Sequence, residues 1–366
     1  MQNIIFITNI PSPYRVKFFN EMTKYFNLSV IFEGKKLKGN PFNYISDSSF
    51  KFKFIYINKN FYNRFKFNFN YILFLFKNRK SIFILSNYSS VNNLIQFILL
   101  RLLGSRYFYE FDGAIIRNDK FITKIYKKFI LSGSLGFFSP SELTDQYIKV
   151  YNKDSKIFRY PFSSLSINDI NRNQKSIKNG INSRNKFEIR IISVGQFIYR
   201  KGFDILLKAI NLLPKQLEIK LKIIGGIPNE ELKKLKELSP FKNNIDFIDY
   251  LSKDKLDEHY EKSDIFILPT REDIWGLVVN EALSKGIPVI TSDKCGAGLE
   301  LIKNAYNGFI FKSEDITELY SLILKVSNEP KLLLEMKNNC INSIKDFTIE
   351  NMAIIHKEVL FSIGGL

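Results

Sequence analysis

Short apolar runs alternate with segments of helical periodicity through the first 160 residues. These runs predict buried strands at 3–8, 28–32, 52–57, 82–85, 107–111 and 135–138. Between the first two runs, Ser12 can cap a helix that begins at Pro13, where the missing amide hydrogen costs nothing. Helical stretches separate several of the other runs. Alternating strands and helices predict a parallel sheet with helices on both faces.

The second half of the chain repeats the alternation more clearly. Apolar runs predict strands at 189–194, 221–224, 245–248, 265–268, 288–291 and 309–311. Helical periodicity appears at 203–213, 230–238, 253–263 and 276–285, and in three closing segments at 316–326, 331–342 and 349–361. This order predicts a second doubly wound α/β domain.

A polar segment at 163–187 separates the two halves. It is rich in Asn and Ser and has no apolar period, so it is interpreted as an interdomain linker. The predicted division is an N-terminal domain at 1–162, the linker, a C-terminal domain at 188–345 and a final helix at 346–366. A length of 366 residues fits two domains.

Composition narrows the class of protein. A hydrophobic content of 45% excludes a disordered chain. Two cysteines and two histidines disfavour a disulfide framework and a multi-ligand zinc site, and fit a reducing cytoplasm. The start of the chain lacks a charged n-region and is expected to be a strand rather than a signal peptide. The apolar runs are too short to predict a membrane-spanning helix.

The net charge of +18 is concentrated in the first part of the chain. Residues 1–160 contain 25 Lys and Arg against 9 Asp and Glu, or +16, which leaves +2 for the rest. Such a field attracts nucleic acid, phospholipid or a phosphorylated substrate, although an AT-rich genome would also enrich lysine. Residues 51–80 interleave Phe and Tyr with Lys. Plain strand and helix structure, docking on an anionic membrane and binding of single-stranded nucleic acid all fit that pattern.

Candidate chemistry lies in the loops that follow the strands of the second domain, because open α/β sheets bind ligands beyond the carboxyl ends of their strands. After the strand at 265–268, Asp273 lies in a loop and Gly276 opens a helix whose first amides can bind a diphosphate. Glu281 lies one turn beyond Leu277 on that helix, where its carboxylate can accept both hydroxyls of a ribose. Glu281 and Lys285 also have the spacing of an ordinary solvated ion pair.

Two further loops extend this candidate site. The loop from Gly195 to Gly202 contains Arg200 and Lys201, which can neutralise a diphosphate, Lys as a compact charge and Arg as a fork. The loop at 292–300 is rich in glycine, and Gly296 is a candidate backbone donor to a phosphate or sugar.

These loops resemble the family 4 glycosyltransferases, which are retaining enzymes with the two-domain GT-B fold. Asp273 and Glu281 match the family's element of an acid, seven residues and a Glu. Gly195, Lys201 and Gly202 match its Gly-Arg…Lys-Gly phosphate element. The resemblance implies that Glu281 holds the nucleotide ribose, that Asp273 holds the donor sugar and that Lys201 stabilises the leaving diphosphate.

The resemblance covers 189–311 firmly and 1–160 more weakly. In the latter, Pro11-Ser-Pro-Tyr-Arg15 and Glu110-Phe-Asp-Gly113 look like members that act on bacterial surface polysaccharides. Pro13, Arg15, Glu110 and Asp112 are therefore candidates for the acceptor or sugar side of the site.

Three departures from the family pattern stand out. Gln196 occupies the place of the usual Arg, and Arg200 is the hypothetical replacement. Asp273 is one methylene shorter than the usual Glu. Glu110 and Asp112 stand where the family has a His-Asp pair.

The resemblance implies two Rossmann-like domains that face a cleft, with the C-terminal helix crossing back to the N-terminal domain. The expected reaction is retaining transfer of a sugar from a nucleotide-sugar, bound by 188–345, to an acceptor on the side of 1–162. No cofactor is expected, and the absence of an Asp-x-Asp motif indicates that no divalent metal is required.

The expected acceptor is a lipid-linked oligosaccharide of capsule, O-antigen or lipopolysaccharide synthesis. The expected location is the cytoplasm, with docking on the inner face of the membrane through the basic N-terminal domain. A Rossmann-type oxidoreductase is the first alternative, but no Gly-x-Gly-x-x-Gly follows a strand. A non-catalytic basic protein that binds nucleic acid or a membrane surface is the second. It would explain the charge but not the acidic pair, so nucleic acid is not an expected partner.

Overall fold

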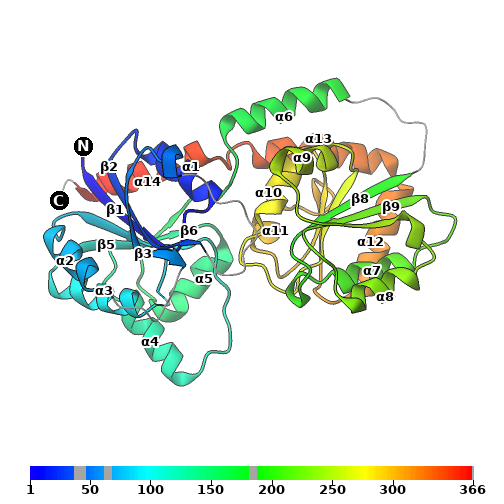
Figure 1. Cartoon of the computed structure of the whole chain (residues 1–366). Coiled ribbons are helices and arrows are strands. Elements are labelled where there is room, and N and C mark those ends of the chain that lie inside the picture. The colour runs from blue at the N-terminus through cyan, green and yellow to red at the C-terminus, as the bar shows by residue number, and fades with distance from the viewer. Residues whose placement is uncertain (37–46, 62–67, 89, 181–187, 365–366) are drawn as a thin grey trace. The chain divides into compact units, whose positions relative to one another are not determined.

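The computed structural model describes residues 1–36, 47–61, 68–88, 90–180 and 188–364. The chain divides into two compact units. The first unit combines Met1–Ser164 with Thr348–Leu366, and the second is Leu165–Phe347. Each unit is built around its own parallel sheet (Figure 1).

The first unit contains a seven-stranded sheet in the order β3-β2-β1-β4-β5-β6-β7, with all neighbouring strands parallel. The interior strand β1 pairs Ile4 with Leu28 of β2 on one side and with Ile82 of β4 on the other. The strands are β1 (Asn3–Thr8), β2 (Asn27–Lys36), β3 (Lys53–Phe61), β4 (Ile82–Leu85), β5 (Arg106–Glu110), β6 (Phe137–Ser139) and β7 (Ile157–Arg159).

Side chains of alternate strand residues point to opposite faces of this sheet. Ile5 and Phe137 join a core with α2 (Phe69–Lys77), α3 (Val91–Leu102), α4 (Phe121–Leu131) and α5 (Glu142–Tyr151). Phe6 and Phe138 instead contact residues of α1 (Pro13–Met22) and α14 (Ile349–Gly364), which pack against each other. The predicted return of the C-terminal helix to the N-terminal domain is therefore confirmed. The short η1 (Asp47–Ser49) precedes β3.

The second unit contains a six-stranded parallel sheet in the order β10-β9-β8-β11-β12-β13. Its strands are β8 (Ile189–Val194), β9 (Ile219–Ile224), β10 (Ile245–Ile248), β11 (Ile265–Leu268), β12 (Val289–Ser292) and β13 (Gly308–Phe311). Its other elements are η2 (Tyr199–Lys201), α7 (Phe203–Asn211), α8 (Glu230–Glu237), η3 (Lys242–Asn244), α9 (Lys253–Glu261), α10 (Leu277–Ser284), α11 (Gly296–Leu301), α12 (Ile316–Asn328) and α13 (Pro330–Ile344).

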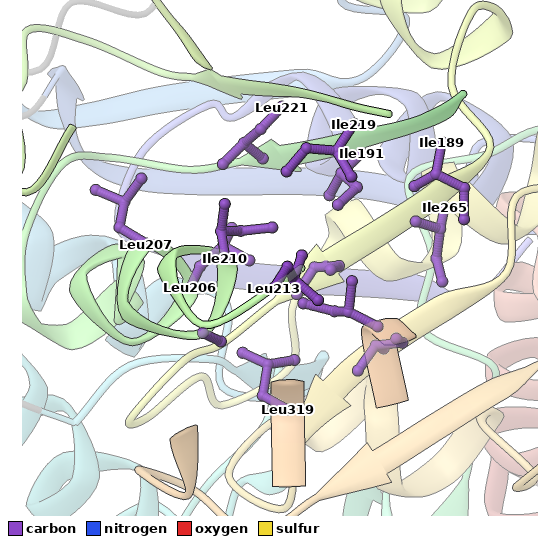
Figure 2. Close-up of a cluster of buried hydrophobic side chains, with 14 of the residues drawn as sticks. Ile189, Ile191, Leu206, Leu207, Ile210, Leu213, Ile219, Leu221, Ile265 and Leu319 are labelled. Atoms are coloured by element: carbon purple, nitrogen blue, oxygen red, sulfur yellow. The ribbon is translucent and has the colours of Figure 1, made fainter. Parts of the chain in front are cut away.

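One core of the second unit lies between its sheet and α7, α12 and α13. Figure 2 shows Ile191 and Leu221 from the strands facing Leu206 and Ile210 of α7, with Leu319 of α12 nearby. These side chains are almost completely buried. The two predicted doubly wound α/β domains are thus confirmed.

The segment expected to be an aperiodic linker is partly helical. Ile167–Gly180 forms α6, and this helix contacts α10 of the second unit. Its Asn173 side chain is buried and donates from Nδ2 to the Ser284 hydroxyl at 3.1 Å. Tertiary packing therefore holds a helix whose Asn- and Ser-rich composition favours loops.

Candidate functional site

The strands β8, β11 and β12 are neighbours in the sheet of the second unit. Their carboxyl ends lead into the three loops that contain the candidate donor-binding residues. Parallel pairing sets these loops along one edge of the sheet.

The loop after β8 depends on two glycines. Gly202 has a φ of +71°, and a Cβ there would lie 1.9 Å from the carbonyl oxygen of Pro269. Only glycine fits this left-handed position at such a close approach. A Cβ at Gly195 would meet the Lys201 side chain at 3.4 Å, so the lysine stem lies directly over that residue. Gln196 contributes its backbone oxygen to the turn, where it accepts from the amide of Ile198 at 2.8 Å.

The cations of this loop meet the acid of the next one. Lys201 Nζ lies 2.5 Å from Asp273 Oδ2, and these side chains are only 12% and 10% exposed. Arg200 Nη1 donates to the carbonyl oxygen of Glu272 at 2.6 Å and lies 3.7 Å from Asp273 Oδ1. Three of the residues singled out from the sequence therefore form one compact charged group.

Arg271 holds that group in place, and sequence reasoning missed it. Its guanidinium makes a two-pronged contact with Asp204 of α7, with both N–O distances at 2.8 Å. It also donates to Glu314 at 2.8 Å and lies 3.9 Å from the ring centroid of Tyr199. The residue clamps η2 between two loops. The sequence carries no local signal of this role, since its partners Asp204 and Glu314 are far away along the chain.

The loop after β12 is bonded to the Asp273 loop. The Asp273 amide donates to the Lys294 carbonyl oxygen at 2.8 Å, and the Gly296 amide donates to the Asp273 carbonyl oxygen at 3.0 Å. The Gly296 amide is therefore already bonded within the protein, and its role as a phosphate donor stays a prediction. A Cβ at Gly296 would lie 2.4 Å from the carbonyl oxygen of Ile274, so its function is to let the loops approach closely.

The N-terminus of α10 is the donor group that remains open. Gly276 precedes the helix with a φ of +97°, and a Cβ there would lie 2.9 Å from Cys295 Sγ and 3.6 Å from Asp273 Oδ2. Within the described residues, the amides of Leu277 and Val278 have no hydrogen-bond acceptor. Their N–H groups and the positive end of the helix dipole favour an anion beside Asp273.

Glu281 lies apart from the Lys201–Asp273 pair, at the junction of α10 and α9. Its Oε2 accepts weakly from the Tyr260 hydroxyl at 3.4 Å. Burial raises the pKa of Glu281, although the charge of Lys253 on α9 opposes the shift. Lys285 pairs with Asp257 at 3.3 Å. The lysine therefore pairs with an acid of α9 rather than forming the ordinary ion pair with Glu281 that the spacing also allowed.

The N-terminal candidates form a buried network in the first unit. The Arg15 guanidinium contacts the carboxylates of Glu110 and Asp112, and the Tyr14 hydroxyl donates to Asp112 at 2.7 Å. The side chains of Arg15 and Glu110 are 2% and 0% exposed, whereas that of Asp112 is 30% exposed. Asp112 and Tyr14 are thus the partly exposed members of the network. Pro13 provides the first residue of α1, as its position after Ser12 predicted.

Sequence reasoning also missed His356, a member of this network on α14. Its Nε2 lies 3.1 Å from Glu110 Oε2, and its ring stacks on Phe138 with centroids 4.0 Å apart. Burial alone would raise the pKa of Glu110, but the charges of Arg15 and His356 outweigh it and hold that pKa below its ordinary value. No local signal links residues 246 positions apart.

The structure describes residues 51–61 and 68–80 of the segment that interleaves aromatic and basic residues. Lys53–Phe61 is the edge strand β3, which agrees with the strand alternative for that part, and residues 62–67 lie outside the described residues. Among the helices that the structure describes, none has the length and apolar character needed to cross a bilayer.

Comparisons with known proteins found a matching family and several similar glycosyltransferases. Residues 173–345 match the family described as Glycosyl transferases group 1. An uncharacterized glycosyltransferase of Haemophilus influenzae is 32% identical over 173 residues, which are 46% of this chain and 48% of that protein, so the match spans about half of each. A capsular polysaccharide biosynthesis glycosyltransferase, CapM of Staphylococcus aureus, is 28% identical over 152 residues, which are 38% of this chain and 37% of that protein.

A third relative has a name that states its reaction. The UDP-Gal:alpha-D-GlcNAc-diphosphoundecaprenol alpha-1,3-galactosyltransferase of Escherichia coli is 35% identical over 82 residues, or 22% of this chain and 21% of that protein.

Solved structures share the architecture of the whole chain. Sucrose-phosphate synthase of Thermosynechococcus elongatus aligns over 100% of both chains with a TM-score of 0.74 at 13% identity. HepE of Anabaena, solved in complex with UDP, aligns over 100% of both chains with a TM-score of 0.74 at 14% identity. At these identities the likeness establishes the fold. With the two parallel sheets, it gives the whole chain the two-domain GT-B fold, and the family match identifies residues 173–345 as a group 1 glycosyl transferase domain.

Proposed function

We propose that the protein transfers a sugar from a nucleotide-sugar to a lipid-linked glycan during synthesis of a bacterial surface polysaccharide. The second unit, corresponding to the predicted domain at 188–345, binds the donor. The first unit, corresponding to 1–162 with the C-terminal helix, receives the acceptor. The coarser statement, a group 1 glycosyl transferase related to enzymes of capsule and lipopolysaccharide synthesis, is already given by the family.

One observation carries the proposal. At the carboxyl edge of the second sheet, a lysine and an arginine lie beside Asp273, and two open helix amides follow a few residues later in the chain. Cations and helix amides bind a diphosphate, and a carboxylate binds sugar hydroxyls. This combination suits a molecule that has a diphosphate bonded directly to a sugar.

The chemistry follows from how charge moves. The bond between the anomeric carbon and the diphosphate oxygen breaks, and its electron pair goes to the diphosphate. Lys201, Arg200 and the amides of Leu277 and Val278 stabilise that negative charge in a preorganised arrangement. The acceptor hydroxyl bonds to the same face of the sugar, and its proton passes to the departing diphosphate. Such a route retains configuration and needs no enzymic base.

The remaining candidates take roles around this centre. Glu281 holds the ribose of the nucleotide, at the α9 end of the site, where Tyr260 orients its carboxylate. Asp112, the partly exposed acid of the buried network in the first unit, binds a hydroxyl of the acceptor.

The acceptor class rests on relatives and on charge. The E. coli relative acts on a sugar attached to diphosphoundecaprenol, and the HepE structure holds UDP. The charge of +16 on residues 1–160 suits an acceptor that carries a diphosphate in an anionic membrane. We therefore place the protein in the cytoplasm, at the inner face of the membrane.

Thermal shift with a panel of nucleoside diphosphates and their sugars tests the donor site, because a bound ligand raises the melting temperature by mass action. Calorimetry on Glu281→Ala should give about 10-fold to 150-fold weaker donor binding, the scale of a lost charged hydrogen bond. Unchanged affinity would remove Glu281 from the site.

Turnover tests the role of Lys201. Lys201→Ala should lower kcat more than it weakens donor binding, because the charge on the diphosphate grows toward the transition state. Lys208→Ala on α7 is the matched control, because this lysine is 41% exposed and pairs with Asp204 outside the loop. Wild-type turnover in Lys201→Ala would contradict the assigned role.

A further inference from the structure

Arg271 lies in the loop after β11, and most of its guanidinium hydrogens are bonded inside the protein. Its Nη1 and Nη2 donate to the two carboxylate oxygens of Asp204, and Nη1 also donates to the carbonyl oxygen of Tyr199, each at 2.8 Å. Its Nε donates to Glu314 at 2.8 Å. These contacts use four of the five N–H groups of a guanidinium. Arg271 is therefore fixed in place before any ligand binds.

The backbone beside this guanidinium holds the next carbonyl oxygen of η2. The Arg271 amide donates to the Arg200 carbonyl oxygen at 2.8 Å, and the Thr270 hydroxyl donates to the same oxygen at 2.9 Å. With the bond to Tyr199, these contacts hold two consecutive carbonyl groups of η2. The loop after β11 therefore fixes the backbone from which both Arg200 and Lys201 extend.

The ring of Tyr199 gives Arg271 a further contact with η2. The guanidinium carbon lies 3.9 Å from the ring centroid, and the electron-rich face of an aromatic ring attracts a cation. Asp204 lies in the first turn of α7, which follows η2 after a single glycine. Arg271 thus holds both η2 and the start of the next helix.

The second acidic partner, Glu314, has an unusual backbone conformation. Its φ is +69°, and in the part of the chain that the structure describes Ala305 is the only other non-glycine residue with a positive φ. A Cβ disfavours this left-handed region because it approaches the following carbonyl oxygen. Glu314 follows β13, so its pair with Arg271 ties a third loop to η2 in spite of that strain. Backbone strain that persists beside a candidate site points to a functional role.

The charges around Arg271 distinguish it from the cations that can bind a phosphate. Its guanidinium already faces two carboxylates, and the side chains of Arg271 and Asp204 are only 14% and 10% exposed. Lys201 and Arg200 instead share a single acid, Asp273, and so keep one positive charge in excess. The diphosphate is therefore expected on Lys201 and Arg200 rather than on Arg271.

We propose that Arg271 is a positioning residue for donor binding, which fixes η2 so that Lys201 and Arg200 both face the diphosphate of the nucleotide-sugar. The inference rests on the proposed function, because it takes the donor diphosphate to bind at this edge of the sheet. Hydrogen bonds from a cation to a phosphate depend on the geometry of the donor groups. A displaced η2 therefore weakens binding even when both cations are still present.

Calorimetry on the full chain tests this role with the nucleoside diphosphate that gives the largest thermal shift among UDP, GDP, ADP, CDP and dTDP. Arg271→Lys keeps the positive charge but loses the fork that reaches Asp204 and Tyr199. It should weaken binding of the diphosphate at least about fivefold, which is part of the effect of one lost charged hydrogen bond.

A substitution of Asp204 separates positioning from simple electrostatics, because the two accounts predict opposite signs. Asp204→Asn removes a negative charge near a site for an anion, and charge alone would tighten binding. Loss of the two-pronged contact with Arg271 should instead weaken binding at least about threefold.

A double-mutant cycle separates positioning from a general loss of stability. In the Lys201→Ala background, Arg271→Lys should weaken binding by less than about twofold, because the main cation that it positions is gone. An effect through stability alone would be equal in both backgrounds.

Two substitutions in the second unit serve as controls. Lys208→Ala removes a cation that pairs with Asp204 at 3.3 Å, and Val326→Ala removes methyl groups from the core on α12. Both should bind the diphosphate within about twofold of wild type. Circular dichroism at the temperature of the binding assay should show that every variant is folded.

Three results would overturn the positioning role while leaving the donor site intact. These are wild-type affinity in Arg271→Lys, tighter binding in Asp204→Asn, and an equal loss from Arg271→Lys with and without Lys201. If wild type binds none of the five nucleoside diphosphates, the donor site itself is refuted, and the positioning role with it.

Discussion

The ion pair between Lys201 and Asp273 should be energetically coupled before any donor binds. The two charged atoms lie 2.5 Å apart, and their side chains are only about one-tenth exposed. A hydrogen bond between charged partners contributes about 1.5–3 kcal/mol, whereas an exposed pair contributes about 0.2–1 kcal/mol. The double-mutant cycle of Lys201→Met and Asp273→Asn should therefore give a coupling of about 2 kcal/mol in the free energy of unfolding.

Urea unfolding followed by tryptophan fluorescence measures this coupling, because the fluorescence reports on the second unit, which contains the ion pair. The chain has a single tryptophan, Trp275, which is 2% exposed in the second unit and two residues from Asp273. The control cycle uses Glu230 and Lys233 on α8, which are 2.7 Å apart but 88% and 50% exposed. That pair should couple by less than about 0.5 kcal/mol. If the buried pair couples no more strongly than this control, the electrostatic account of the site is refuted.

Four further results are expected. Gly202→Ala should lower the free energy of unfolding by at least about 2 kcal/mol, because of its positive φ and the 1.9 Å approach to the Pro269 oxygen; a wild-type urea midpoint would contradict this. Arg271→Lys should cost about 1.5–3 kcal/mol in the same assay, because lysine cannot reproduce the two-pronged contact, and full stability would show that the clamp is unimportant. The lowered pKa of Glu110 means that its ionised form stabilises the fold above its ordinary pKa near 4.5, so wild type should lose more stability than Glu110→Gln between about pH 6 and pH 3; parallel pH profiles would refute this. Burial raises the pKa of Cys295 to about 12, so a thiol reagent at about pH 8 should label it only after unfolding, and rapid labelling of folded protein would contradict its burial.

Much of the fold could be predicted because parallel strands buried on both faces appear in a sequence as unbroken apolar runs. The runs at 189–194 and 265–268 coincide with the observed strands β8 and β11. Helix α6 was not predicted, because its composition favours a loop and the contacts that hold it come from α10.

Some features of the candidate site could likewise be predicted from the sequence, and others could not. Lys201 and Asp273 could be brought together from the sequence because their loops follow neighbouring strands. The bonded state of the Gly296 amide and the clamp of Arg271 could not, because both depend on how separate loops pack. His356 carried no signal, since its partner Glu110 becomes its neighbour only when the last helix returns to the first sheet.

The first unit is assembled from the two ends of the sequence, with the whole second unit inserted between them. During translation, α14 leaves the ribosome only after every strand of both sheets. The second unit is contiguous and has all its parts available earlier. Until α14 arrives, Glu110 lacks its partner His356, and the buried network that Glu110 forms with Arg15 is incomplete. A chain truncated before α14 would therefore contain an incomplete first unit, which the cell's proteases can attack, and a complete second unit.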